Sequence, residues 1–426
     1  MYTLYSMIIG LAFYTVLPFA LLFVGITGKQ REGLGQRLGL YRAIPRCPGR
    51  SRIWLHAASV GEVQAARAII MELHRLLPQA EFILTTMTLH GRKVAQLQLP
   101  PDTTCLLAPL DVPGVVGRVL AQLSPDVYVC IETELWPLLL HKASNRGVKV
   151  VQVNGRLSAN SVAGYKKTGF FFRRVLANFT RMAVISEADR QRYLELGAVA
   201  ERLQVAGNVK YDLQLPPEPE KVQHRRRQLL GIDGDTEVLV AGSTHTGEEE
   251  MLLPLLPRLA VDRPILFLIA PRHLQRLGEL QEMLRGKEIG FHLFSELRAG
   301  GQRRHPLVII DSLGELAEIY SVATYVFCGG SLVGRNGHNI MEAAIWDKAV
   351  FYGPSMDDFR DAVVLLEAAR AGTMVKDAVD LAEQIQNCRE NPEAHRLACL
   401  RAGQVARAQQ GAAAQQATMI VDCLSR

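Results

Sequence analysis

Glu62 is an acidic residue whose place in the sequence raises a chemical question. It lies in LHAASVGEVQAA, residues 55–66, where a buried strand is predicted to end in a turn of small residues before a helix begins. The turn needs Gly61 for backbone freedom and Ser59 can cap the helix, but neither task needs an acid. A carboxylate here can act as general base on an attacking hydroxyl, with His56, Ser59 and Gly61 shaping its loop. The alternative is that Glu62 only stabilises the helix N-terminus.

Two more acids and a lysine follow other predicted strands of the same half of the chain. Glu132 and Glu134 come directly after the apolar run DVYVC, and their alternate spacing lets both side chains point the same way. One acid can orient a basic partner while the other faces a substrate, although a solvated loop explains them too. Lys210, in VAGNVKYD, lies near the predicted domain junction, where it can meet a phosphate or carboxylate. The alternative is an ordinary surface lysine.

Residues suited to a phosphorylated ligand occur in the second half of the chain. Ser243 and Thr244 follow a predicted strand and can form a phosphate-binding nest, although a helix cap explains them equally well. Arg272 ends the next strand, where its guanidinium can pair with a phosphate in a bidentate way. Leu313 and Gly314 form a tight turn before a helix, and the backbone of this turn can contact a base or a phosphate.

The stretch CGGSLVGRNGHNIMEAA, residues 328–344, is the most informative part of the second half. A strand is predicted to end at Gly329 and Gly330, and a glycine-rich loop leads to a helix that opens near Asn339. Asn339 and Glu342 lie three residues apart, on one face of that helix. The helix N-terminus suits a phosphate, and the glutamate suits the paired hydroxyls of a ribose. A capping asparagine with a glutamate in a capping box is the alternative.

Apolar strand-like runs alternate with amphipathic stretches along both halves of the chain. Continuous apolar strands between helices are typical of parallel sheets covered on both faces, and ligands of such sheets bind at the carboxyl ends of the strands. We therefore predict an α/β protein with two Rossmann-like, doubly wound domains facing a central cleft. The predicted parts are a membrane segment (1–28), a first domain (29–214), a linker with a short helix (215–235) and a second domain with the C-terminal helices (236–426).

Composition narrows the possible functions. The chain has 426 residues, 48% of them hydrophobic, which is too long for one core and suits two domains. Lys and Arg outnumber Asp and Glu by 48 to 42, an excess that suits an anionic substrate or membrane surface and is too weak to indicate nucleic acid. Seven scattered cysteines without a CxxC pair indicate free thiols in a reducing compartment, and predict neither a disulfide framework nor a metal site.

The amino terminus predicts a membrane anchor. No charged side chain occurs from Met1 to Gly28, and the apolar stretch 7–26, as a helix, spans ~30 Å, the thickness of a bilayer core. Basic residues are concentrated in 29–52, so the positive-inside rule predicts that the rest of the protein lies in the cytoplasm. The alternative is a helix that lies in the membrane surface without crossing it.

Together these segments resemble the 3-deoxy-D-manno-oct-2-ulosonic acid (Kdo) transferase family of Gram-negative bacteria. The similarity covers nearly the whole chain and is carried, in this order, by HAASVGE, TTMT, PLDVP, IETELWP, NGRLS, GNVKYD, PRH, GGSLVGRNGHNIMEAA and FYGPSMDDF. It implies an inverting glycosyltransferase of the two-Rossmann-domain (GT-B) class at the cytoplasmic face of the inner membrane. An N-terminal acceptor-binding domain and a C-terminal CMP-sugar-binding domain would transfer Kdo from CMP-Kdo to a lipid A precursor, an acylated glucosamine disaccharide phosphate. The resemblance also implies a step of lipopolysaccharide core biosynthesis, with no cofactor and no catalytic metal.

The resemblance assigns roles to individual residues. Glu62 matches the general base of the family, and Glu132 and Lys210 match positions that stabilise the transition state, with Glu134 beside them. The matches to the CMP-binding segments are Pro271, Arg272, Leu313, Gly314, Glu315, Asn339, Ile340, Met341 and Glu342. Ile340 departs from the family pattern, since many members carry proline after the asparagine.

Two other functions are compatible with the same sequence. One is a GT-B transferase that uses a UDP-sugar, which a competition between CMP and UDP would separate. The other is a membrane-tethered scaffold with degenerate nucleotide domains, which would bind no nucleotide. The joint presence of Glu62, Arg272, Asn339 and Glu342 argues against such decay.

Overall fold

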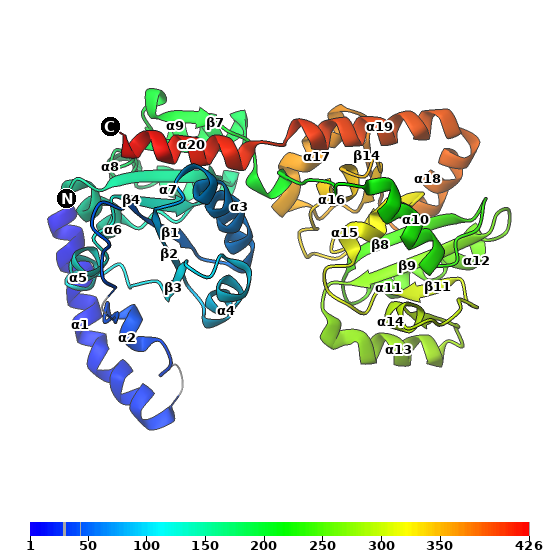
Figure 1. Cartoon of the computed structure of the whole chain (residues 1–426), viewed down its shortest axis with the longest axis horizontal. Helices are drawn as coiled ribbons and strands as arrows, with labels where there is room; N and C mark the ends of the chain where they lie inside the picture. The colour runs from blue at the N-terminus through cyan, green and yellow to red at the C-terminus, as the bar shows by residue number, and fades with distance from the viewer. Residues whose placement is uncertain (29–30, 43, 426) are drawn as a thin grey trace. The chain divides into compact units, whose positions relative to one another are not determined.

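Two parallel sheets organise the chain, one in each of two units (Figure 1). The computed structural model describes residues 1–28, 31–42 and 44–425. Unit 1 comprises Met1–Asp212 and Gly411–Arg426, and unit 2 comprises Leu213–Gln410. The prediction of an α/β protein with two doubly wound domains is confirmed.

The sheet of unit 1 has seven strands in the order β3-β2-β1-β4-β5-β6-β7, and all neighbouring pairs are parallel. Every residue of β1 and β4 is buried, because helices cover both faces of the sheet, and this explains their continuous apolar sequences. The order reverses between β1 and β4, so the loops that follow these two strands meet where ligands of doubly wound sheets bind. The strands are β1 (Arg52–Ala57), β2 (Glu81–Thr86), β3 (Thr104–Leu107), β4 (Val127–Ile131), β5 (Lys149–Gly155), β6 (Arg181–Val184) and β7 (Leu203–Val205).

Helices pack on the two faces of this sheet around two apolar cores. One core joins the sheet to α3 and α20, and the other joins it to α5, α6, α8 and α9. The helices of unit 1 are α1 (Tyr2–Thr27), α2 (Leu34–Arg37), α3 (Val60–Leu76), α4 (Leu89–Gln98), α5 (Val115–Leu123), α6 (Pro137–Asn145), α7 (Ala159–Lys166), α8 (Gly169–Leu176), α9 (Glu187–Glu195), η1 (Ala200–Arg202), η2 (Val209–Tyr211) and α20 (Ala412–Leu424).

Unit 2 repeats this architecture with seven parallel strands in the order β10-β11-β9-β8-β12-β13-β14. They are β8 (Glu237–Thr244), β9 (Ile265–Pro271), β10 (His292–Leu293), β11 (Leu307–Ile309), β12 (Tyr325–Cys328), β13 (Val350–Tyr352) and β14 (Gly372–Met374). The helices are α10 (Pro219–Leu229), α11 (Glu248–Leu252), α12 (Leu255–Leu259), η3 (Leu274–Arg276), α13 (Leu277–Gly286), α14 (Phe294–Arg298), α15 (Leu316–Ile319), η4 (Tyr320–Val322), α16 (Met341–Ala344), η5 (Asp357–Phe359), α17 (Arg360–Ala368), α18 (Ala378–Glu390) and α19 (Pro392–Ala408). The neighbours of β8 are β9 and β12, so the loops after these three strands lie side by side.

The last helix differs from the predicted domain division. The sequence analysis assigned all of 236–426 to the second domain, whereas α20 packs on α3 and β5 of unit 1. Gln416 on α20 is fully buried, accepts a hydrogen bond from the Asn154 backbone N–H (2.8 Å) and donates one to the Gly207 carbonyl (2.9 Å). The amphipathic pattern of a helix does not reveal which of two sheets it covers, because its apolar face fits either.

The predicted linker, 215–235, lies entirely within unit 2. Within 215–235, α10 forms the expected short helix and packs against α15 and η4. Its Arg226 forms ion pairs of 2.6 Å with Glu315 and with Glu318. The prolines and charges that broke the strand–helix rhythm therefore belong to a packed helix of the second unit.

The apolar N-terminal segment forms α1, and the first half of this helix packs against the rest of unit 1. By length and composition α1 could cross a membrane, and it is the one such helix among the described residues. The Tyr2 ring stacks on His141 with ring centroids 3.7 Å apart, and the Tyr14 hydroxyl donates to the Pro113 carbonyl (2.8 Å). In the basic stretch 29–52, residues 29, 30 and 43 lie outside the described ranges.

Candidate functional site

Glu62 lies in the first turn of α3, directly after β1, and its carboxylate accepts hydrogen bonds from the loop that joins the two elements. Ser59 is the N-cap residue, and its hydroxyl accepts the Glu62 N–H (3.2 Å) and donates to Glu62 Oε1 (3.0 Å). The backbone N–H of Ala58 donates to Oε2 (2.8 Å), and only 8% of the Glu62 surface is exposed. The capping arrangement foreseen as the alternative is present, together with burial that a cap does not require.

The electrostatic environment gives Glu62 the properties of a base. The pKa of Glu62 is raised to about 7, chiefly by burial and in smaller part by the nearby Glu132 and Glu134 carboxylates, against the opposing effects of the hydrogen bonds from Ala58 and Ser59. A carboxyl group that is half ionised near neutral pH can accept a proton from a hydroxyl and release it again. Perturbed pKa values of this kind are typical of functional sites.

Glu132 and Lys210 form an ion pair beside the start of α3. Lys210 Nζ lies 2.5 Å from Glu132 Oε1, and both side chains are partly buried. A Cβ atom on Gly61 would lie 3.9 Å from Lys210 Nζ, which places the ammonium group next to the Glu62 turn. The structure therefore brings together Glu62, Glu132 and Lys210 from three separate segments of unit 1.

Glu134 contacts His56 and Trp136. The Trp136 Nε1–H donates to Glu134 Oε2 (2.8 Å), and His56 Nε2 lies 3.5 Å from the same oxygen. Burial alone would raise the pKa of Glu134, but the His56 and Trp136 contacts outweigh it and hold the pKa below its usual value. The pKa of Glu62 is thus raised while the pKa of the neighbouring Glu134 is lowered. Such a difference allows one site to hold a proton acceptor beside a fixed negative charge.

Polar residues at the end of β5 support this site and were not singled out from the sequence. The Asn154 Nδ2–H donates to Glu132 Oε1 (3.4 Å) and Asn154 Oδ1 accepts the Val209 N–H (2.9 Å), so Asn154 links the two loops. Gln152 donates to the Glu132 carbonyl (2.5 Å). A usable signal was the alternation of Gln152 and Asn154 in the otherwise apolar strand KVVQVNG.

In unit 2, Arg272, Asn339 and Glu342 gather beyond the ends of β9 and β12. Asn339 Oδ1 accepts the Met341 N–H (3.1 Å), but α16 begins at Met341 with Ile340 as its N-cap residue, so Asn339 lies one residue before the predicted capping position. Burial raises the pKa of Glu342, opposed by the Arg272 guanidinium and by a hydrogen bond from Asn339. Ser243, the last residue but one of β8, has a positive φ of 59°, an unusual conformation for a residue other than glycine.

The other predicted nucleotide-binding residues have varied environments. The tight turn is present, with Gly314 at φ 84° and the Leu313 side chain 82% exposed. Glu315 is paired with Arg226 and Arg298 of unit 2. Three of these residues have buried apolar side chains, so a ligand would contact their backbone atoms. They are Pro271, Ile340 and Met341.

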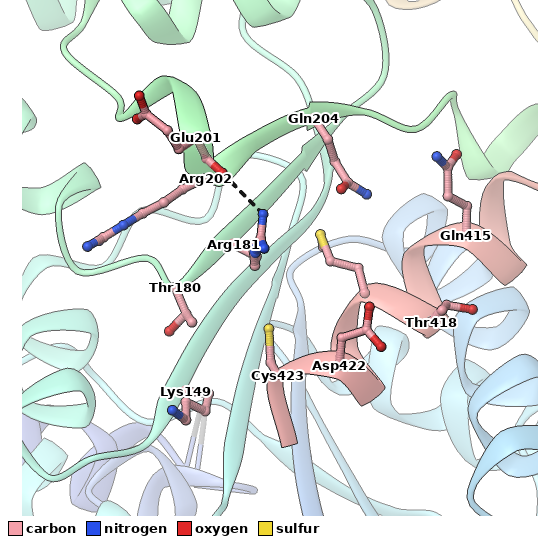
Figure 2. A pocket seen from close by; sticks show the side chains of 11 residues that line it. Lys149, Thr180, Arg181, Glu201, Arg202, Gln204, Gln415, Thr418, Asp422 and Cys423 are labelled. Carbon is pink, nitrogen blue, oxygen red and sulfur yellow. Dashed lines mark hydrogen bonds between the residues drawn. The ribbon is translucent and has the colours of Figure 1, made fainter. Parts of the chain in front are cut away.

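A polar hollow of about 580 Å³ lies elsewhere in unit 1 (Figure 2). It is bordered by Lys149 and Arg181, the first residues of β5 and β6, and by Gln415 and Asp422 of α20. These are the amino ends of the strands, the opposite edge of the sheet from Glu62 and Glu132. Among the residues that the structure describes, its lining contains none of the predicted site residues.

Solved structures define the class of protein to which this fold belongs. The structure of Anabaena Alr3699/HepE in complex with UDP is 13% identical, has a TM-score of 0.58 and covers 88% of this chain and 99% of that one. A glycosyltransferase from Rickettsia africae is 13% identical, with a TM-score of 0.57 and coverage of 89% and 99%. With two doubly wound units, the chain has the fold of the GT-B class.

Sequence comparison gives the family. The model of the 3-deoxy-D-manno-octulosonic-acid transferase (kdotransferase) family matches residues 32–213. The 3-deoxy-D-manno-octulosonic acid transferases of Haemophilus influenzae and Chlamydophila psittaci are each 30% identical; the matches cover 87% and 92% of this chain, and 88% and 89% of theirs. The chain belongs to this family, and its activity is Kdo transfer in lipopolysaccharide biosynthesis.

One relative is a longer protein. The bifunctional glycosyltransferase/methyltransferase of Fusobacterium nucleatum is 28% identical over 78% of this chain, and the match covers 52% of its own length. Both activities in its name are stated of that protein alone, of which the match covers about half the length.

Proposed function

We propose that the chain transfers Kdo from CMP-Kdo to a lipid A precursor by a single inverting displacement in which Glu62 is the general base. The observation that carries this assignment is the buried Glu62 carboxyl group with its pKa of about 7, beside the Lys210–Glu132 pair. In this mechanism Glu62 removes the proton of a sugar hydroxyl of the acceptor. The oxygen attacks the anomeric carbon of Kdo, and CMP leaves with the electrons of the broken C–O bond.

The negative charge of phosphate and sugar carboxylate is balanced in this proposal by Lys210 and Arg272. Glu132 holds the Lys210 ammonium in place, and Glu134, fixed by His56 and Trp136, supports the loop. Positioned cations stabilise charge that develops in a transition state more strongly than water does. With these cations in place we propose that no metal or other cofactor takes part in the reaction.

The donor in this proposal is held by unit 2. Arg272 pairs with the phosphate, and Asn339 and Glu342 bind the nucleotide, in agreement with their mutual contacts. We expect CMP to inhibit the transfer at least tenfold more strongly than UDP, measured as inhibition constants against the donor. The opposite order would favour a UDP-sugar transferase.

We also propose that α1 attaches the enzyme to the cytoplasmic face of the inner membrane, where an acylated acceptor resides. The contacts of α1 with unit 1 described above end at Tyr14, and the side chains of Phe19, Leu22 and Ile26 are exposed. The remaining turns to Thr27, about 13 residues, measure about 20 Å, short of the ~30 Å of a bilayer core. This favours insertion into one leaflet over a complete crossing.

Replacement of Ser59 by alanine is expected to move the acidic limb of the pH–rate profile to higher pH. The Ser59 hydroxyl lowers the pKa of Glu62 by its hydrogen bond, so its loss raises that pKa above 7. The lost cap also costs about 0.5–2 kcal/mol of stability. The measurement is kcat/KM between pH 5.5 and 9.

Ser158→Ala is the matched control for this variant, because Ser158 caps α7 of the same unit through the Ser161 N–H. It should lose stability to a similar extent and leave the acidic limb where it is. An unchanged limb in the Ser59 variant would contradict the assignment of that limb to Glu62.

A further inference from the structure

Three histidines that the proposed mechanism does not use lie together in unit 2. His245 follows β8, His273 follows β9, and His338 lies in the loop after β12. Because β8 lies between β9 and β12 in the sheet, the topology brings the three loops to one edge. The His245 ring lies 5.4 Å from the His273 ring and 5.1 Å from the His338 ring, measured between centroids.

His245 and His338 form a hydrogen-bonded, stacked pair. Their Nε2 atoms are 2.9 Å apart, and their ring planes differ by 5°. A neutral imidazole has one N–H and one acceptor nitrogen, so one Nε2 must donate and the other accept. One added proton can be carried on Nδ1 of the donating ring, whose Nε2–H then still donates to the unprotonated Nε2 of the other ring. Two added protons would put N–H groups face to face, so the pair tolerates one positive charge and not two.

The acids near this pair are already engaged. Glu248 accepts backbone N–H groups of His245 (3.0 Å), Gly330 (2.6 Å), Ser331 (3.1 Å) and Leu332 (3.0 Å). Glu249 is bound to Arg276 and Thr244, and Glu342 lies near Arg272 and Asn339. The remaining titratable or charged groups that face the pair are Arg272, His273, Arg276, Arg335 and the Cys328 thiol, whose Sγ contacts the His338 carbonyl.

Burial, together with this cationic surrounding, keeps the pair neutral when no anion is bound. The pKa of His338 is lowered to about 3, chiefly by burial and in smaller part by the Arg272 guanidinium and the other two imidazoles. Burial also lowers the pKa of His245, with smaller effects from His273 and the arginines. A negative charge placed among these groups raises the pKa of a nearby imidazole, since it favours the charged form.

We propose that the His245–His338 pair belongs to the site for the phosphate of the nucleotide donor, and that it takes up one proton when that phosphate binds. This inference rests on the proposed function, because it takes the donor to be a cytidine nucleotide held by unit 2. His338 directly precedes Asn339, and Arg272 acts on both His338 and Glu342, so the pair lies within the predicted donor site. The proton partly neutralises the phosphate while the N–H···N contact is kept.

The test is calorimetric titration of the full chain with the methyl phosphodiester of CMP, whose phosphate does not titrate near neutral pH. Titrations at pH 6.5 in two buffers of different ionisation enthalpy give the number of protons exchanged. We expect uptake of up to one proton per ligand, and an affinity that weakens by up to about tenfold for each unit of rising pH. The double variant His245→Gln/His338→Gln should bind with no proton uptake and with an affinity independent of pH.

His273→Gln is the matched control, because this third imidazole belongs to the same cluster but not to the pair. It should keep the proton uptake of the wild type. Binding by the wild type without proton uptake would overturn this inference and leave the proposed function standing. Loss of proton uptake in the His273 variant, with uptake retained in the double variant, would do the same. No binding at any pH would overturn both.

Discussion

Replacement of Glu62 by glutamine is expected to slow Kdo transfer strongly and, at the same time, to stabilise the protein at alkaline pH. General bases contribute about 10²–10⁴ to the rate, so kcat should fall by that factor, measured as product formed per enzyme at pH 8. Glutamine preserves the shape of the side chain and can still accept the Ala58 N–H. What it removes is the ability to take a proton.

The gain in stability follows from the sign of the pKa shift. The pKa of Glu62 is raised from 4.5 to about 7 in the folded protein, so the folded state holds this proton more tightly than the unfolded state. The contribution of this group to the free energy of unfolding is fully present below pH 4.5 and is lost as the pH rises through about 7. The loss amounts to up to about 3 kcal/mol. The glutamine variant avoids that cost, so urea unfolding should show it more stable than the wild type at pH 8.5 and similar at pH 4.5.

Glu187→Gln is a matched control, since Glu187 also lies in the first turn of a helix of unit 1 but is exposed and paired with Arg190. It should retain full activity. Equal losses of stability at both pH values in the Glu62 variant, with turnover retained, would show that Glu62 acts as a helix cap and not as a base.

Replacement of Lys210 by methionine is expected to lower the rate of a single turnover by about 10²–10³, the usual effect of removing one group that stabilises transition-state charge. The change also leaves the Glu132 carboxylate without its ammonium partner at 2.5 Å, close to Glu62. The additional negative charge raises the pKa of Glu62, so the acidic limb of the pH–rate profile should move to higher pH. The measurement is the single-turnover rate at saturating donor across this pH range.

Lys166→Met is the control for that change, because Lys166 also forms an ion pair in unit 1, with Glu195 at 2.8 Å, but both partners are exposed. Its removal should leave rate and pH profile unchanged. The double variant Glu132→Gln/Lys210→Met should restore the position of the acidic limb and not the rate. A Lys210 variant that keeps more than half of the wild-type rate would contradict the role given to the ammonium group.

The strand–helix alternation was sufficient to predict the two sheets and the positions of Glu62, Glu132 and Arg272 at strand ends. This works because parallel strands buried on both faces have continuous apolar sequences that end where the polar loop begins. Contacts between distant segments left no such local signal. Gln416 reaches Asn154 across 262 residues, and the His245–His338 contact joins segments 93 residues apart.

Backbone conformations at the site were equally hidden from the sequence. Glu132, Asn154 and Ser243 have positive φ values of 55°, 52° and 59°, which non-glycine side chains seldom adopt. Tertiary hydrogen bonds such as those of Asn154 and Gln152 hold the loop after β4 in place, and their geometry exists only once the sheet has formed. Motif order supplied the site residues that we propose, and the fold was needed to see which contacts hold them in place.

The most direct test of the account is to incubate the purified protein with CMP-Kdo, generated in situ, and a tetraacylated lipid A precursor, and to read the products by mass spectrometry. The account predicts that the wild type adds one or more Kdo units to the precursor and that the Glu62→Gln variant forms about 10²–10⁴-fold less product in the same time. An unchanged precursor with the wild type, while CMP-Kdo stays intact and a known active enzyme modifies the same acceptor, would contradict it.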